Sequence, residues 1–352
     1  MHQEPSGVRI MAYTTIDDPS AHFQTALYTG TGSSHSITND GNSDLQPDFI
    51  WIKERDGTGQ HGAFDSSRGV QKELKIDETG AEGTASQSVT AFNSDGFTVG
   101  TAGDYNGSDN LQVAWQWKCN GGTTSSNTDG NVTVTLQANT TAGFSIGTWT
   151  SNGGTSGTIG HGLGARPDIV ITKERDDTGN WNVIVPDYAS NQMGFLQSTS
   201  AFGVASGINT VGSSTFTDGD GADSNDRVFY AFRSIQGYSK IGQYKGNGDA
   251  DGTFVYTGFK PAFLIAKEAG ATRNWTMAAS KLQTAGNGTN TNSFQPNIAG
   301  AQDANERMDW LSNGFKLRTI STTWNTDNGT FIYAAFAKNP FVTSGGVPCT
   351  AR

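Results

Sequence analysis

One short stretch occurs three times in this chain, first as Pro47-Asp48-Phe49-Ile50-Trp51-Ile52-Lys53-Glu54. It returns at residues 167–174 and again at residues 261–268. Each copy has a proline, a short run of mostly apolar residues rich in β-branched and aromatic side chains, and then Lys-Glu. An apolar run without helical spacing is typical of a strand that is covered on both faces. We therefore expect one kind of central strand, used three times.

The two ends of the repeated stretch indicate where this strand begins and ends. Proline suits the first residue of a strand, because its missing N–H interrupts no ladder hydrogen bond there. The Lys-Glu pair is expected to mark the point where the strand leaves the core. Between these ends, Trp51, Ile171 and Ile265 are expected at corresponding buried positions.

Composition indicates the fold class. Glycine makes up 46 of the 352 residues, about twice its usual share, and only 16% of the residues are charged. Apolar residues do not keep a helical spacing for long, whereas short apolar runs between Gly, Asn and Asp turns are frequent. This pattern predicts an all-β fold of three related antiparallel β-sandwich-like repeats, each of about 95–105 residues.

The three repeats also match outside the central strand. Fourteen residues after each proline stand His61, Trp181 and Trp275, which are expected to open the next strand. Each repeat closes with an Ala-aromatic pair, namely Ala114-Trp115, Ala231-Phe232 and Ala335-Phe336. Repeats 2 and 3 adjoin directly near Gly237, whereas the tract between repeats 1 and 2 is longer than a simple linker needs.

These landmarks divide the chain into six parts. They are an N-terminal arm (1–23, with Met11 as a candidate natural start), β repeat 1 (24–120), a Gly/Ser/Thr-rich connection (121–142), β repeat 2 (143–235), β repeat 3 (236–340) and a C-terminal tail (341–352). Residues 1–10 lack an apolar pattern and capping signals, so they are expected to be dispensable for folding. The repeats are either separate sandwiches or sectors of one pseudo-threefold body.

Charge and cysteine content exclude several classes of protein. The net charge of −10 argues against nucleic acid and anionic membranes as partners, since both need a basic surface. The sequence has no apolar stretch of about 18 residues and no signal-peptide pattern, so no membrane insertion is expected. Cys119 and Cys349 are far apart and are expected to be two free thiols.

Several segments resemble one family of proteins. The segments are Met11–Gly30, Gly237–Lys240, Pro261–Ile265, Asp309–Phe315 and Phe331–Phe341. They look like repeat proteins of marine tailed bacteriophages, of the cyanophage and pelagiphage kind, that carry an uncharacterised domain. The similarity covers nearly the whole chain after Met11. It brings no catalytic motif, so no functional residue can be carried over and the binding residues stay unknown.

The resemblance implies a non-enzymatic structural protein, located in the virion after assembly in the host cytoplasm. Its expected place is a tail-fibre or tail-associated component that contacts a glycan or receptor on the host surface. The alternatives are a capsid decoration or head-fibre protein and, less favoured, a glycan-degrading tailspike enzyme. The expected partners are other virion proteins and further copies of the chain.

One acidic loop is a candidate metal site. Asp218, Asp220, Asp223 and Asp226 alternate with glycine and polar residues, and Ca²⁺ prefers six to eight oxygen ligands. The spacing is not that of an EF-hand, and a solvated hairpin loop is the simpler interpretation. The acidic turn at 249–252 is a weaker candidate. No cofactor is expected to be required, with Ca²⁺ as the one that could bind.

Tryptophan and histidine residues are the remaining candidates for a functional site. Trp51, Trp115 and Trp149 are expected in the core. The other tryptophans are less tied to strand positions, and some of them are expected at the surface, where they could stack on sugar rings: Trp117, Trp181, Trp275, Trp310 and Trp324. None of the five histidines has a metal-ligand spacing.

The acidic loop yields a first testable prediction. Its carboxylates repel one another unless a cation gathers them, so weak Ca²⁺ binding should appear in titration calorimetry at millimolar Ca²⁺. A flat titration that also leaves the Tm unchanged would identify the segment as an ordinary solvated loop.

Overall fold

The structure is a computed structural model that describes residues 12–153, 157–189, 191–204, 210–218, 224–283 and 290–349. These residues form an all-β fold, as predicted. Helices within these ranges are short: η1 (Pro19–Ala21), α1 (Gly103–Asn106), η2 (Ser280–Leu282) and α2 (Thr322–Asn325). The expectation for residues 1–10 lies outside the described residues. No described helix is long and apolar enough to span a membrane.

Repeat 1 is a sandwich of a large and a small sheet. The large sheet has the order β1-β9-β3-β4-β5-β6. Its strands are β1 (Phe23–Thr29), β3 (Phe49–Glu54), β4 (Gly62–Asp65), β5 (Lys72–Lys75), β6 (Gly83–Thr84) and β9 (Leu111–Trp117). The small sheet, in the order β2-β8-β7, has β2 (His35–Ile37), β7 (Val89–Phe92) and β8 (Phe97–Val99).

Repeat 2 has the same plan with an extended edge. The large sheet has the order β10-β11-β12-β19-β14-β15-β16-β17. Its strands are β10 (Ser125–Asn127), β11 (Val134–Asn139), β12 (Phe144–Thr150), β14 (Ile169–Glu174), β15 (Asn182–Ile184), β16 (Gln192–Phe195), β17 (Gly203–Val204) and β19 (Asp226–Phe232). The small sheet pairs β13 (Gly157–Gly160) with β18 (Thr215–Asp218).

In repeat 3 the corresponding sheets are continuous, in the order β20-β27-β22-β23-β24-β25-β26-β21. The strands are β20 (Ser239–Lys245), β21 (Phe254–Tyr256), β22 (Phe259–Glu268), β23 (Thr276–Ala279), β24 (Asn290–Phe294), β25 (Asp303–Leu311), β26 (Gly314–Leu317) and β27 (Thr330–Pro340). The large sheets of the three repeats share one strand order, because β1-β9-β3-β4-β5, β12-β19-β14-β15-β16 and β20-β27-β22-β23-β24 correspond strand by strand.

The central strands are covered on both faces, as their apolar runs predicted. Successive side chains of a strand point to opposite faces. In β3, Phe49 and Trp51 belong to a core at the centre of the molecule. Ile50 and Ile52 belong to the core between the two sheets of repeat 1. Repeats 2 and 3 have their own inner cores of the same kind.

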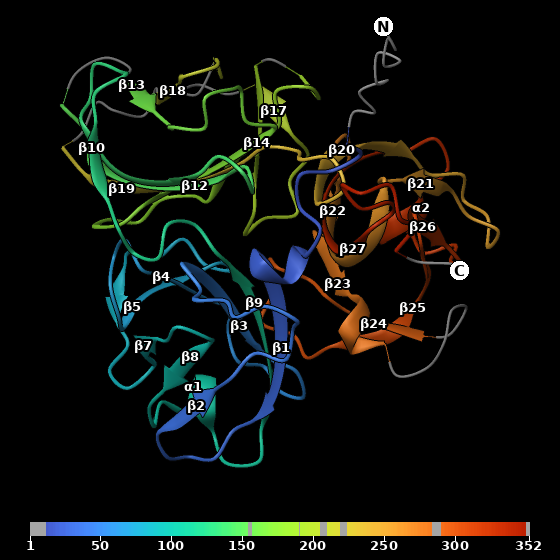
Figure 1. Cartoon of the computed structure of the whole chain (residues 1–352), viewed down its shortest axis with the longest axis horizontal. Coiled ribbons are helices and arrows are strands. Elements are labelled where there is room, and N and C mark those ends of the chain that lie inside the picture. The colour runs from blue at the N-terminus through green and yellow to red at the C-terminus, as the bar shows by residue number, and fades with distance from the viewer. Residues whose placement is uncertain are drawn as a thin grey trace, which may run out of the picture.

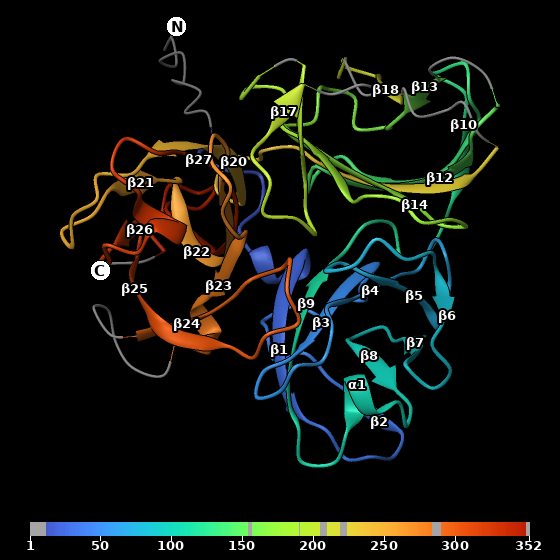
Figure 2. The ribbon, with the colours of Figure 1, turned by 180° about the vertical axis from the view of Figure 1, so that it is seen from behind.

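The core at the centre joins all three repeats. Trp117, Phe232 and Phe336 are equivalent, because each pairs with the residue two positions after the strand proline of its repeat. The expected match of Ala114-Trp115 with the other two Ala-aromatic pairs is therefore wrong by two residues. The three equivalent residues lie in the last strand of each repeat and pack against one another. Their ring centroids lie 5.5 Å apart for Trp117–Phe336 and Phe232–Phe336, and 6.1 Å apart for Trp117–Phe232. Figure 1 and Figure 2 show the three repeats as three lobes around this centre. The chain is therefore one pseudo-threefold body with a shared core.

Backbone hydrogen bonds close the three lobes into a ring. In each repeat, the residue after the Lys-Glu pair accepts a hydrogen bond from a backbone N–H of a neighbouring repeat. The bonds are Glu82 N–H to Arg175 O (2.6 Å), Phe202 N–H to Ala269 O (2.8 Å) and Gln302 N–H to Arg55 O (2.8 Å). Each bond joins a different pair of repeats, so the connection runs through all three junctions.

The residues expected to open the next strand lie at these junctions. Strands β4, β15 and β23 begin one residue after His61, Trp181 and Trp275, which confirms the expectation. Trp181 Nε1 donates to Lys75 O of repeat 1, and Trp275 Nε1 donates to Phe195 O of repeat 2, each at 2.9 Å. The third member, His61, is buried beside Phe294 of repeat 3, with ring centroids 6.4 Å apart.

The expectation that Lys-Glu marks the exit of the strand from the core is wrong. Lys53, Lys173 and Lys267 are buried. Each ammonium group donates to the carbonyl of the following residue, Glu54, Glu174 or Glu268, at 2.5–2.6 Å. These bonds replace hydration, so the lysines can remain inside at the rim of the core. Burial lowers the pKa of all three to about 8.

The tract 121–142 is more than the connection expected from its composition. Strands β10 and β11 lie in it and extend the large sheet of repeat 2. Val134 and Leu136 of β11 enter the core of that repeat. The preceding segment of the chain therefore supplies part of repeat 2. Its apolar and polar residues alternate as in a half-buried strand, a signal that the Gly/Ser/Thr-rich composition of the whole tract outweighed.

The equivalence of Trp51, Ile171 and Ile265 is confirmed for position and only in part for burial. All three occupy the same place on the central strand and face the shared core. Trp51 is buried, whereas the two isoleucines are half-buried. They border an apolar cavity of about 50 Å³ that side chains from all three repeats line.

Replacing Trp51→Ala should lower the free energy of unfolding by about 3–5 kcal/mol, as for other large-to-small changes in cores. The loss combines apolar burial with the bond from Trp51 Nε1 to His61 Nδ1 (3.0 Å). Urea denaturation measures it. The matched control is Ile320→Ala at an exposed site, expected within about 0.5 kcal/mol of wild type. Equal effects at the two sites would contradict the shared core.

The buried lysines predict a pH dependence of stability. A pKa near 8 in the folded state lies below the ordinary value of 10.5, so between these pH values the unfolded chain binds more protons. The free energy of unfolding should therefore rise with pH in this window, by about 1–3 kcal/mol per lysine. Lys267→Met should remove its share of the rise, whereas Lys338→Met, at an exposed position, should not. Identical pH slopes for wild type and Lys267→Met would contradict the assignment.

Candidate binding site

The junctions between repeats are built alike and contain the main surface grooves. Ser67, Asp187 and Lys281 each stand twenty residues after the strand proline of their repeat. Asp187 and Lys281 bond the first strand of the next repeat around the ring, β20 and β1, whereas Ser67 bonds Gln137 of β11, the strand that pairs with β12. The three junctions differ in what fills the space beside that strand.

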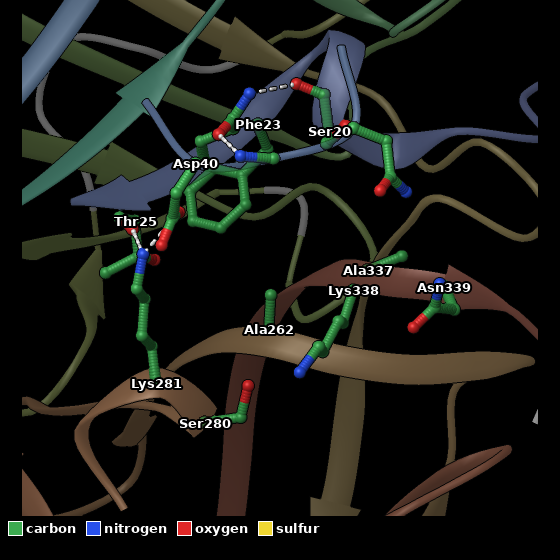
Figure 3. A pocket seen from close by; sticks show the side chains of 13 residues that line it. Ser20, Phe23, Thr25, Asp40, Ala262, Ser280, Lys281, Ala337, Lys338 and Asn339 are labelled. Carbon is green, nitrogen blue, oxygen red and sulfur yellow. Dashed lines mark hydrogen bonds and ion pairs between the residues drawn. The ribbon is translucent and has the colours of Figure 1, made fainter. Parts of the chain in front are cut away.

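The junction between repeats 3 and 1 holds a polar groove of about 310 Å³ (Figure 3). Lys281 reaches across it and donates to Thr25 O at 2.9 Å, and its Nζ lies 2.5 Å from Asp40 Oδ1. Phe23 and Ala262 form apolar parts of the wall. Lys281 thus bonds a backbone acceptor of β1 and narrows access to this strand.

Lysines give this groove a positive character. Lys338 lines it and is exposed. Its charge, together with burial as the larger cause, lowers the pKa of nearby Lys260. Since Lys281 is paired with Asp40, it is the ammonium group of Lys338, with the amide of Asn339 and the hydroxyl of Ser280 in the same groove, that suits a carboxylate or another oxygen-rich ligand.

The junction between repeats 2 and 3 holds a wider groove of about 620 Å³ between β20 and β21. Phe254 and Tyr256 of β21 are 44% and 55% exposed, which is unusual for aromatic residues of this chain. Gln243 Nε2 donates to Asp187 O at 2.8 Å across the junction. Lys240 and Lys245 of β20 are exposed. This groove combines apolar surface, positive charge and two strand edges.

The junction between repeats 1 and 2 is filled by the chain itself. Strand β11 pairs with β12 there, and Gln137 Nε2 donates to Ser66 Oγ at 2.8 Å and to Ser67 Oγ at 2.7 Å. The same space is thus occupied by a strand at this junction, bridged by Lys281 at the junction between repeats 3 and 1, and open beside β20.

The largest group of buried titratable side chains is structural in character. Arg68 pairs with Asp65 at 2.5 Å and with Glu82 at 3.0 Å. Glu82 also accepts from Arg175 of repeat 2, and Tyr230 donates to Asp65 at 2.6 Å. The paired carboxylates keep the pKa of Arg68 well above its usual value despite burial. This cluster ties repeat 1 to repeat 2.

The structure describes two of the four aspartates of the candidate Ca²⁺ loop. Asp220 and Asp223 lie outside the described residues, and Asp218 is the last residue of β18. Asp226 opens β19 and accepts from Thr150 Oγ1 at 2.6 Å. Among the described residues, no three His, Cys, Asp or Glu side chains are placed to share a metal ion.

The weaker acidic turn is held by its own contacts. Asp251 lies 3.0 Å from Lys316 Nζ and 2.5 Å from Arg318 Nη1, and these cations lower its pKa. Its carboxylate therefore neutralises basic side chains of repeat 3.

The expected surface tryptophans are all buried, so that expectation is wrong. The eight residues, Trp51, Trp115, Trp117, Trp149, Trp181, Trp275, Trp310 and Trp324, each retain 5% exposure or less. They fill the shared core and the cores within the repeats. Cys119 and Cys349 are free thiols, as predicted. Among the described residues, the exposed aromatic residues are Phe254 and Tyr256. Their strand of three residues is too short to give a recognisable pattern in the sequence.

Comparison with known proteins supports the extent of this fold unit. The profile of a family described as a domain of unknown function (DUF7483) matches residues 18–340, which include all three repeats. Neither the curated proteins nor the solved structures give a match. Since one family profile extends through the entire ring of repeats, the chain belongs to the DUF7483 domain family.

Proposed function

We propose that this chain is a non-enzymatic structural protein of a tailed-phage virion, placed in the tail, where it contacts the host surface. The first support is the resemblance of several segments to repeat proteins of marine tailed phages. The observation that carries the proposal is the closed ring of repeats around one core. Such a body is rigid and displays several loops and grooves at fixed positions, which suits attachment.

The chemistry of the described side chains also favours binding over catalysis. The buried carboxylates and guanidinium groups at the junction of repeats 1 and 2 bond one another. The buried lysines bond backbone carbonyls. By contrast, the grooves beside β1 and β20 present amines, amides and aromatic rings to solvent. These groups can recognise a partner without chemical change.

A body with three similar lobes suits a partner with threefold symmetry, because each lobe can then meet an equivalent surface. A trimeric tail component would provide such a site. A threefold position on the capsid would do so as well, and this geometry makes capsid decoration the second candidate. Several copies on one particle would raise the effective concentration of weak host contacts.

The experiment compares the two placements directly. Fluorescently labelled protein is added to host cells and, separately, to capsids from which the protein has been stripped. The tail proposal predicts saturable binding to cells, abolished when the protein is first heat-denatured, and density on the tail in cryo-electron microscopy of the particle. Protein that ignores cells but rebinds stripped capsids would overturn the tail placement and establish decoration.

A further inference from the structure

We propose that the groove between β20 and β21 binds an extended segment of a partner polypeptide, which adds to β20 as an antiparallel strand. The groove is the open counterpart of the space that β11 fills in repeat 2. The chain therefore contains an example of the occupant.

The correspondence of the two sites follows from register. Phe144 of β12 pairs with Phe232, and Ser239 of β20 pairs with the equivalent Phe336. Counting along the strands, Ile146 then corresponds to Ile241, and Thr148 corresponds to Gln243. Strand β11 pairs with β12 at these positions through Gln137 and Thr135. An added strand would meet Gln243 in the same way. At Ile241 it would meet the carbonyl, because the N–H already donates to Ser234 Oγ at 3.0 Å.

The outer edge of β20 retains free hydrogen-bonding groups. In an antiparallel ladder, alternate residues direct both N–H and C=O to the same side. Ser239 and Ile241 bond outward to Ile235 and Ser234, so Gln243 also faces outward. Within the described part of the chain, its backbone N–H and C=O have no partner on that side. An exposed strand edge of this kind is a template for another strand.

The other two junctions show how such an edge is closed. At β12 the edge is covered by β11. At β1, Lys281 donates to Thr25 O, the outward carbonyl that corresponds to Ile241 O. A lysine at a strand edge is a known way to prevent pairing. Asp187 holds the corresponding position beside β20, and its own carbonyl bonds the Gln243 side chain. At Gln243 the edge of β20 has neither kind of cover. On either side of it, Ile235 and Ser234 bond Ser239 and Ile241, and Thr253 Oγ1 donates to Lys245 O at 2.6 Å.

The second wall of the groove fits the apolar side of an added strand. In repeat 2 the segment before β11 also reaches β13, because Val132 bridges to Ile159. The counterpart of β13 is β21, whose Phe254 and Tyr256 are exposed toward the groove. A strand with alternating apolar residues, like Val134 and Leu136 of β11, would cover these rings. Their exposure is thereby explained as part of an interface.

The charge of the groove indicates which charge the partner segment should carry. Lys240 and Lys245 are exposed on β20, while the carboxylate of Asp187 is already paired with Arg166. The groove is thus positive on an acidic protein. The partner segment should be neutral or acidic, and a glutamate opposite Lys240 should strengthen binding. In the register of β11, Ala138 occupies this place, since it pairs with the corresponding Ser145.

The test uses the full chain and a fluorescent peptide with the sequence of residues 132–138, because Ile235 already pairs with Ser239 at the place of Asn139. Anisotropy should show saturable binding below about 1 mM. Gln243→Pro removes the outward N–H at an edge position that tolerates proline, and should weaken binding about tenfold or more. Gln243→Ala loses the same side chain but keeps the N–H, and should bind within about threefold of wild type. Thermal melting confirms that both variants fold.

Three variant peptides test binding to the wild-type protein, so the proposal can be tested even if the Gln243→Pro protein does not fold. Methylation of the peptide backbone nitrogen of the residue corresponding to Gln137 should abolish binding. The Ala138→Glu peptide should bind more tightly than the Ala138→Lys peptide. The proposal is overturned if the peptide does not bind, if Gln243→Pro binds as wild type does, or if an oligosaccharide occupies the groove while the peptide does not.

Discussion

The packing of three equivalent aromatic residues, Trp117, Phe232 and Phe336, is the contact on which the rest of this structure depends. Each ring belongs to the last strand of its repeat, and each touches the other two. This contact exists because the large sheets are apolar on both faces. The small sheet of a repeat covers one face, and the other face would meet water if the repeat stood alone. Closing three repeats into a ring buries all three inner faces at once.

Much of this arrangement could be predicted from sequence, and the failures have physical causes. The repeated apolar runs identified the strands and their equivalence, since side-chain periodicity is a local property. The burial of Lys53 could not be predicted from periodicity. Lysine usually ends a buried strand, and its burial here depends on carbonyls that the following turn brings within reach. Likewise, Trp181 and Trp275 are buried by residues of neighbouring repeats. Their burial could therefore not be predicted from the sequence of one repeat alone.

The candidate site was less visible in the sequence than the fold. A groove between repeats depends on which strand edges stay uncovered, and coverage is decided by segments distant in the chain. Strand β11 covers repeat 2 because a long tract precedes that repeat. Repeat 3 follows repeat 2 directly, so no comparable strand is available for β20. The sequence shows that a long tract precedes repeat 2 and that none precedes repeat 3. Only the sheet order shows that this tract adds a strand to repeat 2.

Because the three repeats are related by pseudo-symmetry, residue differences at equivalent positions indicate where the surface differs in function. Equivalent positions share backbone geometry, so a change of residue at one of them alters the surface while the fold is kept. Ser67, Asp187 and Lys281 are such positions: the first bonds an added strand, and the last bonds the strand edge itself. Asp187 does neither with its side chain, which pairs with Arg166 of its own repeat. A duplicated fold can in this way keep two junctions closed for stability and leave a third open for a partner.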